Sequence, residues 1–233
     1  DINVTNGPWE EMSWEFWFKP EKLPTAGQTI TLYEQGGNTR GVHLYLSGTQ
    51  DSDPTEAEIY MLALNRAETF WGGTLNQVGG EGVTAVKSTV KLGSVYHVAF
   101  VLVGDPSGDL EGTLTGYVNG RQIGQVSGVD MLYAHSNAIA FAYAADQAVT
   151  HDEGNRGEIT GLGFTGVIDD AVFYHSSLTE EQAVAHFEGG FAGKVSDAIE
   201  ITAQPQDATV QEGKTATFSV DFNGMPVVDV KWL

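Results

Sequence analysis

The chain has 233 residues, of which 41% are hydrophobic and 10% aromatic, so it is globular rather than disordered. Its 31 acidic residues outnumber its 11 basic ones, and the formal net charge of −20 argues against nucleic acid and anionic membranes, both of which require basic patches. It has no cysteine, which excludes disulfides, thiolate metal sites and cysteine catalysis.

Strand patterns dominate the chain. Residues 13–19 alternate, with Trp14, Phe16 and Phe18 on one face. Residues 95–103 are almost continuously apolar, which predicts a central strand that is covered on both faces. In chain order, the predicted strands cover residues 13–19, 29–34, 41–47, 58–64, 95–103, 113–118, 121–126, 138–144 and 164–174. The glycine-rich residues 65–94 and the polar residues 145–163 show no clear pattern.

Two local signals fix connections between these elements. Asn119-Gly120 predicts a tight hairpin between the strands on either side of it. Thr179 and Gln182 form a capping box, which predicts a helix over residues 180–188 that ends at Gly189-Gly190. Many strands with one short helix, and no alternation of strands and helices, predict an all-β fold, a two-sheet antiparallel jelly-roll sandwich.

The composition changes near residue 190. We expect a first domain over residues 1–190, a linker over 191–198, and the N-terminal strands of a truncated immunoglobulin-like domain over 199–233. In that partial β-sandwich Trp232 would be the core tryptophan of the third strand, although the usual strand-B cysteine is absent. Because the chain begins at Asp1, we expect it to be an internal piece of a longer, processed protein.

Four segments in order resemble the bacterial laminin-G-like jelly-roll family, whose relatives include concanavalin, the pentraxins and the laminarinases. They are SWEFWFKP at 13–20, VYHVAFVL at 95–102, GYVNGRQIG at 116–124 and FTGVIDDAVFYHSSLTEEQ at 164–182. The last segment is the most specific, whereas Tyr96 stands where the family more often has tryptophan. The resemblance covers residues 1–190 and implies a concanavalin A-like fold.

The resemblance also implies a structural calcium ion. In the family, the aspartate at the position of Asp169 often helps to hold calcium, together with backbone groups near the N-terminus and in the second strand. By this similarity the calcium site would comprise Asp169, the segment around Asn6 and Gly7, and the segment that begins at Glu34. The alternative is that Asp169 is hydrogen-bonded within the chain and binds no metal.

Enzymatic residues are not evident. The laminarinase relatives carry their carboxylates in a Glu-x-Asp-x-x-Glu run, and this chain has no such run, so we expect no catalytic activity. The six histidines are not at zinc-ligand spacing, and no phosphate-binding loop or nucleophile elbow is present.

Sugar binding requires aromatic rings beside polar groups, because pyranose faces are apolar and their rims carry hydroxyls. The ligand-binding candidates are Trp71, Tyr133, His135, Asp146 and Arg156. We therefore expect a carbohydrate-binding or adhesion module of a secreted or cell-surface bacterial protein, with a polysaccharide, another glycan or a surface protein as its partner. A protein-adhesion or spacer module is the alternative, and a glycoside hydrolase or lyase is a third reading.

Overall fold

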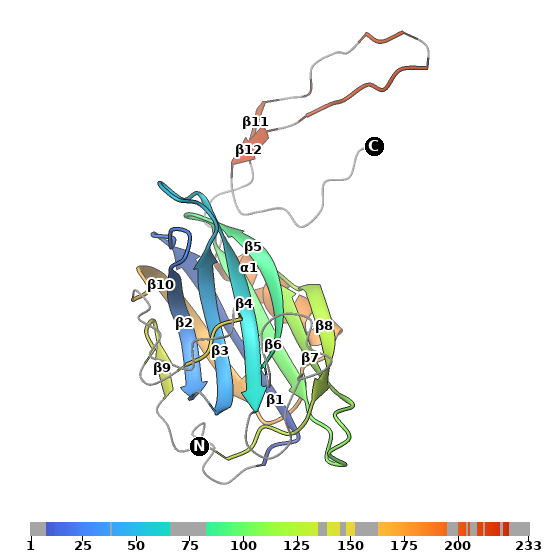
Figure 1. Cartoon of the computed structure of the whole chain (residues 1–233). Coiled ribbons are helices and arrows are strands. Elements are labelled where there is room, and N and C mark those ends of the chain that lie inside the picture. Colours follow the sequence, from blue (N-terminus) through green and yellow to red (C-terminus); the bar gives the residue numbers. More distant parts are fainter. Residues whose placement is uncertain are drawn as a thin grey trace.

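Ten strands pair into two antiparallel sheets of five, which confirms the predicted all-β sandwich (Figure 1). The structure is a computed structural model, and it describes residues 8–37, 39–65, 83–134, 139–144, 148–151 and 163–194, together with 200–203, 205, 209–211, 213–219 and 221–223. The first sheet has the order β10 (Gly166–Tyr174), β1 (Glu11–Pro20), β6 (Tyr96–Val103), β7 (Gly112–Val118) and β8 (Arg121–Val129). The second has the order β5 (Val83–Lys91), β4 (Glu56–Asn65), β3 (Arg40–Gly48), β2 (Thr29–Gly36) and β9 (Ile139–Phe141).

The core lies between the two sheets and follows from strand alternation. In β1, Trp14, Phe16 and Phe18 point inward and are almost fully buried, as their spacing predicts. The indole Nε1 of Trp14 donates a hydrogen bond of 3.1 Å to Oε1 of Gln35 on β2, which also accepts from the Tyr33 hydroxyl at 2.6 Å. This buried polar contact links the two sheets across an otherwise apolar core.

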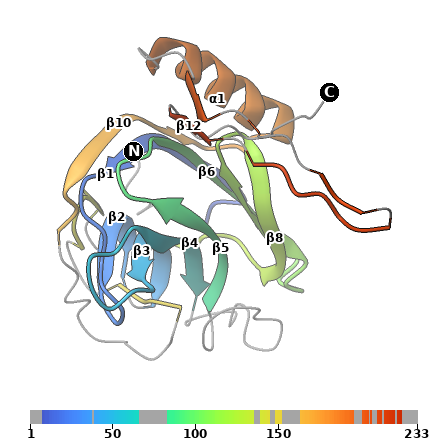
Figure 2. The same cartoon turned by 90° about the horizontal axis from the view of Figure 1, so that it is seen from above.

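The first sheet is also covered on its outer face. Its middle strand β6 buries alternate residues in the core and Ala99 and Val101 on the other side, so the prediction of a strand covered on both faces is confirmed. The cover is α1 (Glu180–Lys194), which lies over this sheet on the side away from β2–β5 (Figure 2). Trp17 points outward from β1 and stacks on Phe187 of the helix, with ring centroids 5.8 Å apart.

Both local signals in the sequence behave as expected. Asn119 and Gly120 have φ values of 52° and 72°, the left-handed conformation that a two-residue hairpin turn requires. The Thr179 hydroxyl accepts from the Gln182 N–H at 3.2 Å, and the Gln182 side chain accepts from the Thr179 N–H at 2.9 Å, which completes the capping box.

Three features differ from the sequence predictions. Strand β5 forms in a segment where the sequence showed no clear pattern. The pattern is unclear because the outward positions of this strand carry alanine, lysine and threonine and so do not form a uniformly polar row. The helix does not end at Gly189-Gly190 but continues to Lys194, so the first residues of the predicted linker are helical. Within the described parts of residues 199–233, β11 (Glu200–Ala203) and β12 (Asp221–Asn223) pair as a separate two-stranded antiparallel sheet. Trp232 lies outside the described residues, and the immunoglobulin-like assignment stays a prediction.

Candidate functional site

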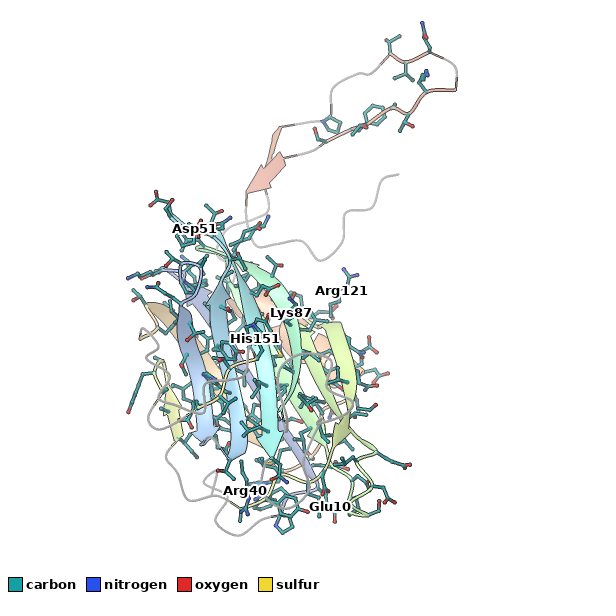
Figure 3. The ribbon with its side chains drawn as sticks, in the orientation of Figure 1. Glu10, Arg40, Asp51, Lys87, Arg121 and His151 are labelled. Carbon is teal, nitrogen blue, oxygen red and sulfur yellow. The ribbon has the colours of Figure 1, made fainter. Side chains whose placement is uncertain are left out.

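The outer face of the second sheet carries a row of side chains that crosses four strands. Thr31, Tyr45, Tyr60 and Lys87 are direct cross-strand partners from β2 to β5, so all four project from the same face. This face points away from α1, and Figure 3 shows Lys87 and His151 on it. It is the part of the sandwich that we consider as a binding site.

Four aromatic rings are stacked across the middle of this face, beginning with His43, whose ring lies 4.4 Å from that of Tyr45. The rings of Tyr45 and Tyr60 lie 5.3 Å apart and nearly parallel, and the imidazole of His151 lies on Tyr60 at 3.7 Å with an interplanar angle of 7°. The Tyr45 oxygen accepts from the His151 backbone N–H at 2.7 Å and lies 2.7 Å from His151 Nδ1. These two contacts fix the His151 imidazole against the Tyr45 hydroxyl.

One half of the face is closed by residues 148–151, which we call the strap. Val149 is fully buried there among Tyr45, Tyr60 and the apolar outward residues of β4 and β5. Its carbonyl accepts from Nδ1 of His43 at 3.0 Å, while Nε2 of His43 lies 3.1 Å from the Thr31 hydroxyl. Burial lowers the pKa of His43 to about 4, so this imidazole is neutral at pH 7 and holds the strap as a structural residue.

The other half of the face is polar and open. Glu58 accepts from Nζ of Lys87 at 2.7 Å through Oε1 and from the Tyr60 hydroxyl at 2.8 Å through Oε2. The side chains of Lys87 and Glu58 are 45% and 29% exposed, and Ser47 and Thr89 flank Glu58 on the neighbouring strands. We call Glu58, Tyr60, Lys87 and His151 the open-end cluster.

The contacts of Glu58, Tyr60 and Lys87 shift the pKa values of these three side chains. Partial burial acts to raise the pKa of Glu58, but the hydrogen bonds from Lys87 and Tyr60 outweigh it and lower that pKa below its ordinary value. Burial and the neighbouring Glu58 raise the pKa of Tyr60 to about 12, and the hydrogen bond to Glu58 raises the pKa of Lys87. Near neutral pH Glu58 is therefore an anion, Lys87 a cation and the buried Tyr60 hydroxyl neutral, so the cluster presents one ion pair beside the His151 ring.

Glu34 and Glu58 both point outward from this sheet, opposite His43 and Ser47 of β3 respectively. Four residues of β3 at ~3.3 Å each and two strand spacings of ~4.8 Å separate them by about 16 Å between backbone positions. Glycosidases hold their two carboxyl groups at most about 9.5 Å apart. Glu58 is turned toward Lys87 of β5, on the side of β4 away from Glu34 of β2, so this pair does not form such a site.

Among the predicted ligand-binding residues, Tyr133 lies within the described ranges, and it is not part of the open-end cluster. The half-buried Tyr133 donates its hydroxyl to Oδ2 of Asp130 at 3.0 Å, and its ring faces the Arg40 guanidinium at 6.0 Å. Arg40 lies at the end of the sheet opposite Asp51, away from Lys87 (Figure 3). The other four candidates, Trp71, His135, Asp146 and Arg156, lie outside the described residues.

The described members of the predicted calcium set do not converge. Asp169 pairs with Trp17 in the first sheet and shares its outward face, while Glu34 is buried on the outer face of the second sheet. These two carboxylates point away from each other across the sandwich, so they do not fit as ligands of one ion. Asn6 and Gly7 lie outside the described residues, and within the described ranges no group of three or more histidine, aspartate or glutamate side chains is placed to hold a metal.

Asp169 lies at an irregular, exposed part of its sheet. β10 is an edge strand, and its pairing with β1 is interrupted by a bulge next to Asp170, whose φ is 48°. The carboxylate of Asp169 accepts from the Asp170 N–H at 2.9 Å, and both residues are exposed. A carboxylate at an exposed bulge is solvated and therefore does not require a metal ion to offset a burial cost.

A second polar cluster lies beneath α1 and is closed. Glu15 of β1 is 6% exposed; its Oε2 lies 3.0 Å from Nδ1 of His186 and 3.3 Å from Nε2 of His97, and its Oε1 accepts from the Tyr174 hydroxyl at 2.6 Å. These contacts join the helix to three strands of the first sheet. The cluster is a structural anchor for α1, because the helix covers it.

Comparisons with known proteins agree with the fold. Residues 2–184 match the sequence profile of a family described as the concanavalin A-like lectin/glucanases superfamily. No curated protein sequence matches the chain. The binding domain of botulinum neurotoxin serotype G is similar in structure, with a TM-score of 0.54 and 12% identity over 84% of this chain and 40% of that chain.

Two further solved structures overlap with lower scores. A heptameric pentraxin from Limulus polyphemus has a TM-score of 0.46 and 16% identity, covering 77% of this chain and 70% of the other. Domain 4 of AbnA, an extracellular arabinanase from Geobacillus stearothermophilus in complex with arabinotriose, has a TM-score of 0.47 and 17% identity, covering 77% and 68%. At these identities structural similarity bears on the fold alone.

Proposed function

Since the chain belongs to the concanavalin A-like lectin/glucanase superfamily, we propose that it is a non-catalytic carbohydrate-binding module that holds its ligand at the open-end cluster. The observation that carries this proposal is the meeting of the His151–Tyr60 stack with the exposed pair Glu58 and Lys87. The partly exposed imidazole of His151 offers a flat ring surface to one face of a pyranose, and the charged pair offers a donor and an acceptor to its hydroxyls.

The proposal also concerns the location of the module and the segment that follows it in the chain. We infer that it belongs to a secreted or cell-surface protein, in which residues 199–233 begin an immunoglobulin-like domain. The acidic composition and the absence of cysteine are compatible with an extracellular bacterial module. In the part of the chain that the structure describes, no helix is both long and apolar enough to cross a membrane.

Binding of the whole chain to a panel of soluble polysaccharides, by isothermal titration calorimetry, tests this function. The informative variant is Lys87→Ala, because Lys87 contacts both Glu58 and the Tyr60 ring. Its matched control is Lys91→Ala on the same strand, where the lysine also pairs with a glutamate, Glu56, at 3.8 Å. We expect Lys87→Ala to weaken binding about tenfold, the loss of one charge-assisted hydrogen bond, and Lys91→Ala to bind like the wild type.

Two results would contradict the proposal. Absence of binding to every polysaccharide of the panel would remove the carbohydrate-binding function and favour the protein-adhesion alternative. If the wild type and Lys87→Ala bound the polysaccharide with equal affinity, the ligand would bind elsewhere than at the open-end cluster.

A further inference from the structure

In the open-end cluster, the negative charge of Glu58 is neutralised by the positive charge of Lys87. This pairing limits which glycans the cluster accepts. We infer that the ligand is an uncharged glycan, and that Glu58 and Lys87 together select against glycans that carry carboxylates. The inference rests on the proposed carbohydrate-binding function and specifies its ligand class.

A sugar with neighbouring hydroxyls fits the ion pair without breaking it. The Lys87 ammonium has three N–H donors, and Glu58 takes one of them at 2.7 Å. The Glu58 carboxylate accepts from Lys87 and Tyr60 and has lone pairs for further donors. One sugar hydroxyl can thus accept from Lys87 while the next donates to Glu58, and both side chains are exposed enough to be reached.

A glycan carboxylate binds less favourably than a hydroxyl at this ion pair. If it took one of the other two Lys87 donors, two carboxylates would share one cation, and the glycan carboxylate would lie close to the like charge of Glu58. Glu58 is only 29% exposed and lies against the buried Tyr60, so water compensates incompletely for that repulsion. The net charge of −20 adds a longer-range repulsion that salt screens.

The test uses matched pairs of ligands. Each neutral polysaccharide of the panel is compared with a version of itself in which part of the CH2OH groups have been oxidised to carboxylates, at low and at high salt. We expect the wild type to bind the neutral form at least about tenfold more tightly than the oxidised form at low salt, and less selectively at high salt.

Glu58→Gln is the informative variant, since it keeps the shape of the side chain while releasing Lys87 for an anionic ligand. We expect it to reduce the preference for the neutral form by at least about tenfold. Glu188→Gln is the matched control, because this substitution removes the same charge from the chain. Glu188 is an exposed glutamate on α1, which covers the opposite sheet.

The outcomes separate the two proposals. Equal or tighter binding of the oxidised forms by the wild type would overturn the selectivity and leave carbohydrate binding intact, as would equal effects of Glu58→Gln and Glu188→Gln. Failure of both forms of every polysaccharide to bind would overturn the proposed function and this inference together.

Discussion

The anchor of α1 makes a quantitative prediction about stability and pH. Glu15 accepts hydrogen bonds from His97, His186 and Tyr174 in a site that the helix covers. Burial acts to raise the pKa of Glu15, but these hydrogen bonds and the charge of His186 outweigh it and lower the pKa from 4.5 to about 2. Glu15→Gln keeps the size of the side chain and removes the charge.

The magnitude follows from that pKa. A carboxyl that titrates at about 2 in the folded protein and at 4.5 in the unfolded chain contributes about 3 kcal/mol to the free energy of unfolding. Because the folded-state pKa is the lower one, this contribution is complete above pH ~5 and is lost as the pH falls toward 2. We therefore expect Glu15→Gln to be about 3 kcal/mol less stable at pH 6 and to approach the wild type at pH 2.

Urea denaturation of the whole chain at several pH values between 2 and 7 measures this difference. Glu11→Gln serves as a control on the same strand, since its carboxylate accepts hydrogen bonds from Ser177 but is exposed. We expect less than about 1 kcal/mol for it. Free energies for Glu15→Gln that run parallel to those of the wild type at every pH would refute the reasoning.

Three further predictions concern the turn, the helix cap and the metal. Gly120→Ala should lower the free energy of unfolding by about 1 kcal/mol more than Gly108→Ala, measured by thermal or urea unfolding. Both glycines have positive φ, but of the two only Gly120 would place a Cβ within 3.2 Å of Phe187. Equal losses of stability would contradict this contact. Thr179→Ala should lower the free energy of unfolding by about 1 kcal/mol through loss of the N-cap, compared with an unchanged value for the exposed Thr49→Ala; equal stability of the two variants would argue that the cap contributes nothing. If calcium binds through Asp169, calcium should raise the Tm relative to EDTA in the wild type and in Glu34→Gln but not in Asp169→Ala. The reverse pattern in the two variants, or no effect of calcium on the Tm of the wild type, would contradict calcium binding at Asp169.

The fold was largely readable from the sequence because its signals are local. Alternation in β1, the apolar run of β6, the Asn119-Gly120 turn and the capping box at Thr179 each depend on residues close together in the chain. The true end of α1 was missed because Gly190 is required by packing rather than by a cap: a Cβ there would lie 2.6 Å from the Trp17 ring. Sequence alone does not show that contact.

The candidate site was not predicted, although part of its signal was present. Period-two alternation in residues 41–47 and 58–64 places Tyr45, Glu58 and Tyr60 on the face opposite the core residues. What the sequence does not give is the register that makes Lys87 the cross-strand neighbour of Tyr60, or the strap that brings His151 onto the Tyr60 ring. Both are contacts between segments far apart in the chain.

The location of a bound glycan tests the central claim most directly. Hydrogen–deuterium exchange of the whole chain, with and without an oligosaccharide derived from the tightest-binding neutral polysaccharide, reports which backbone amides become protected. We expect added protection at the polar ends of β4 and β5 around Glu58 and Lys87 and in the strap, with no change in α1 on the opposite sheet. Protection confined to α1 and β10, or to the end of the sheet near Arg40 and Tyr133, would contradict the account.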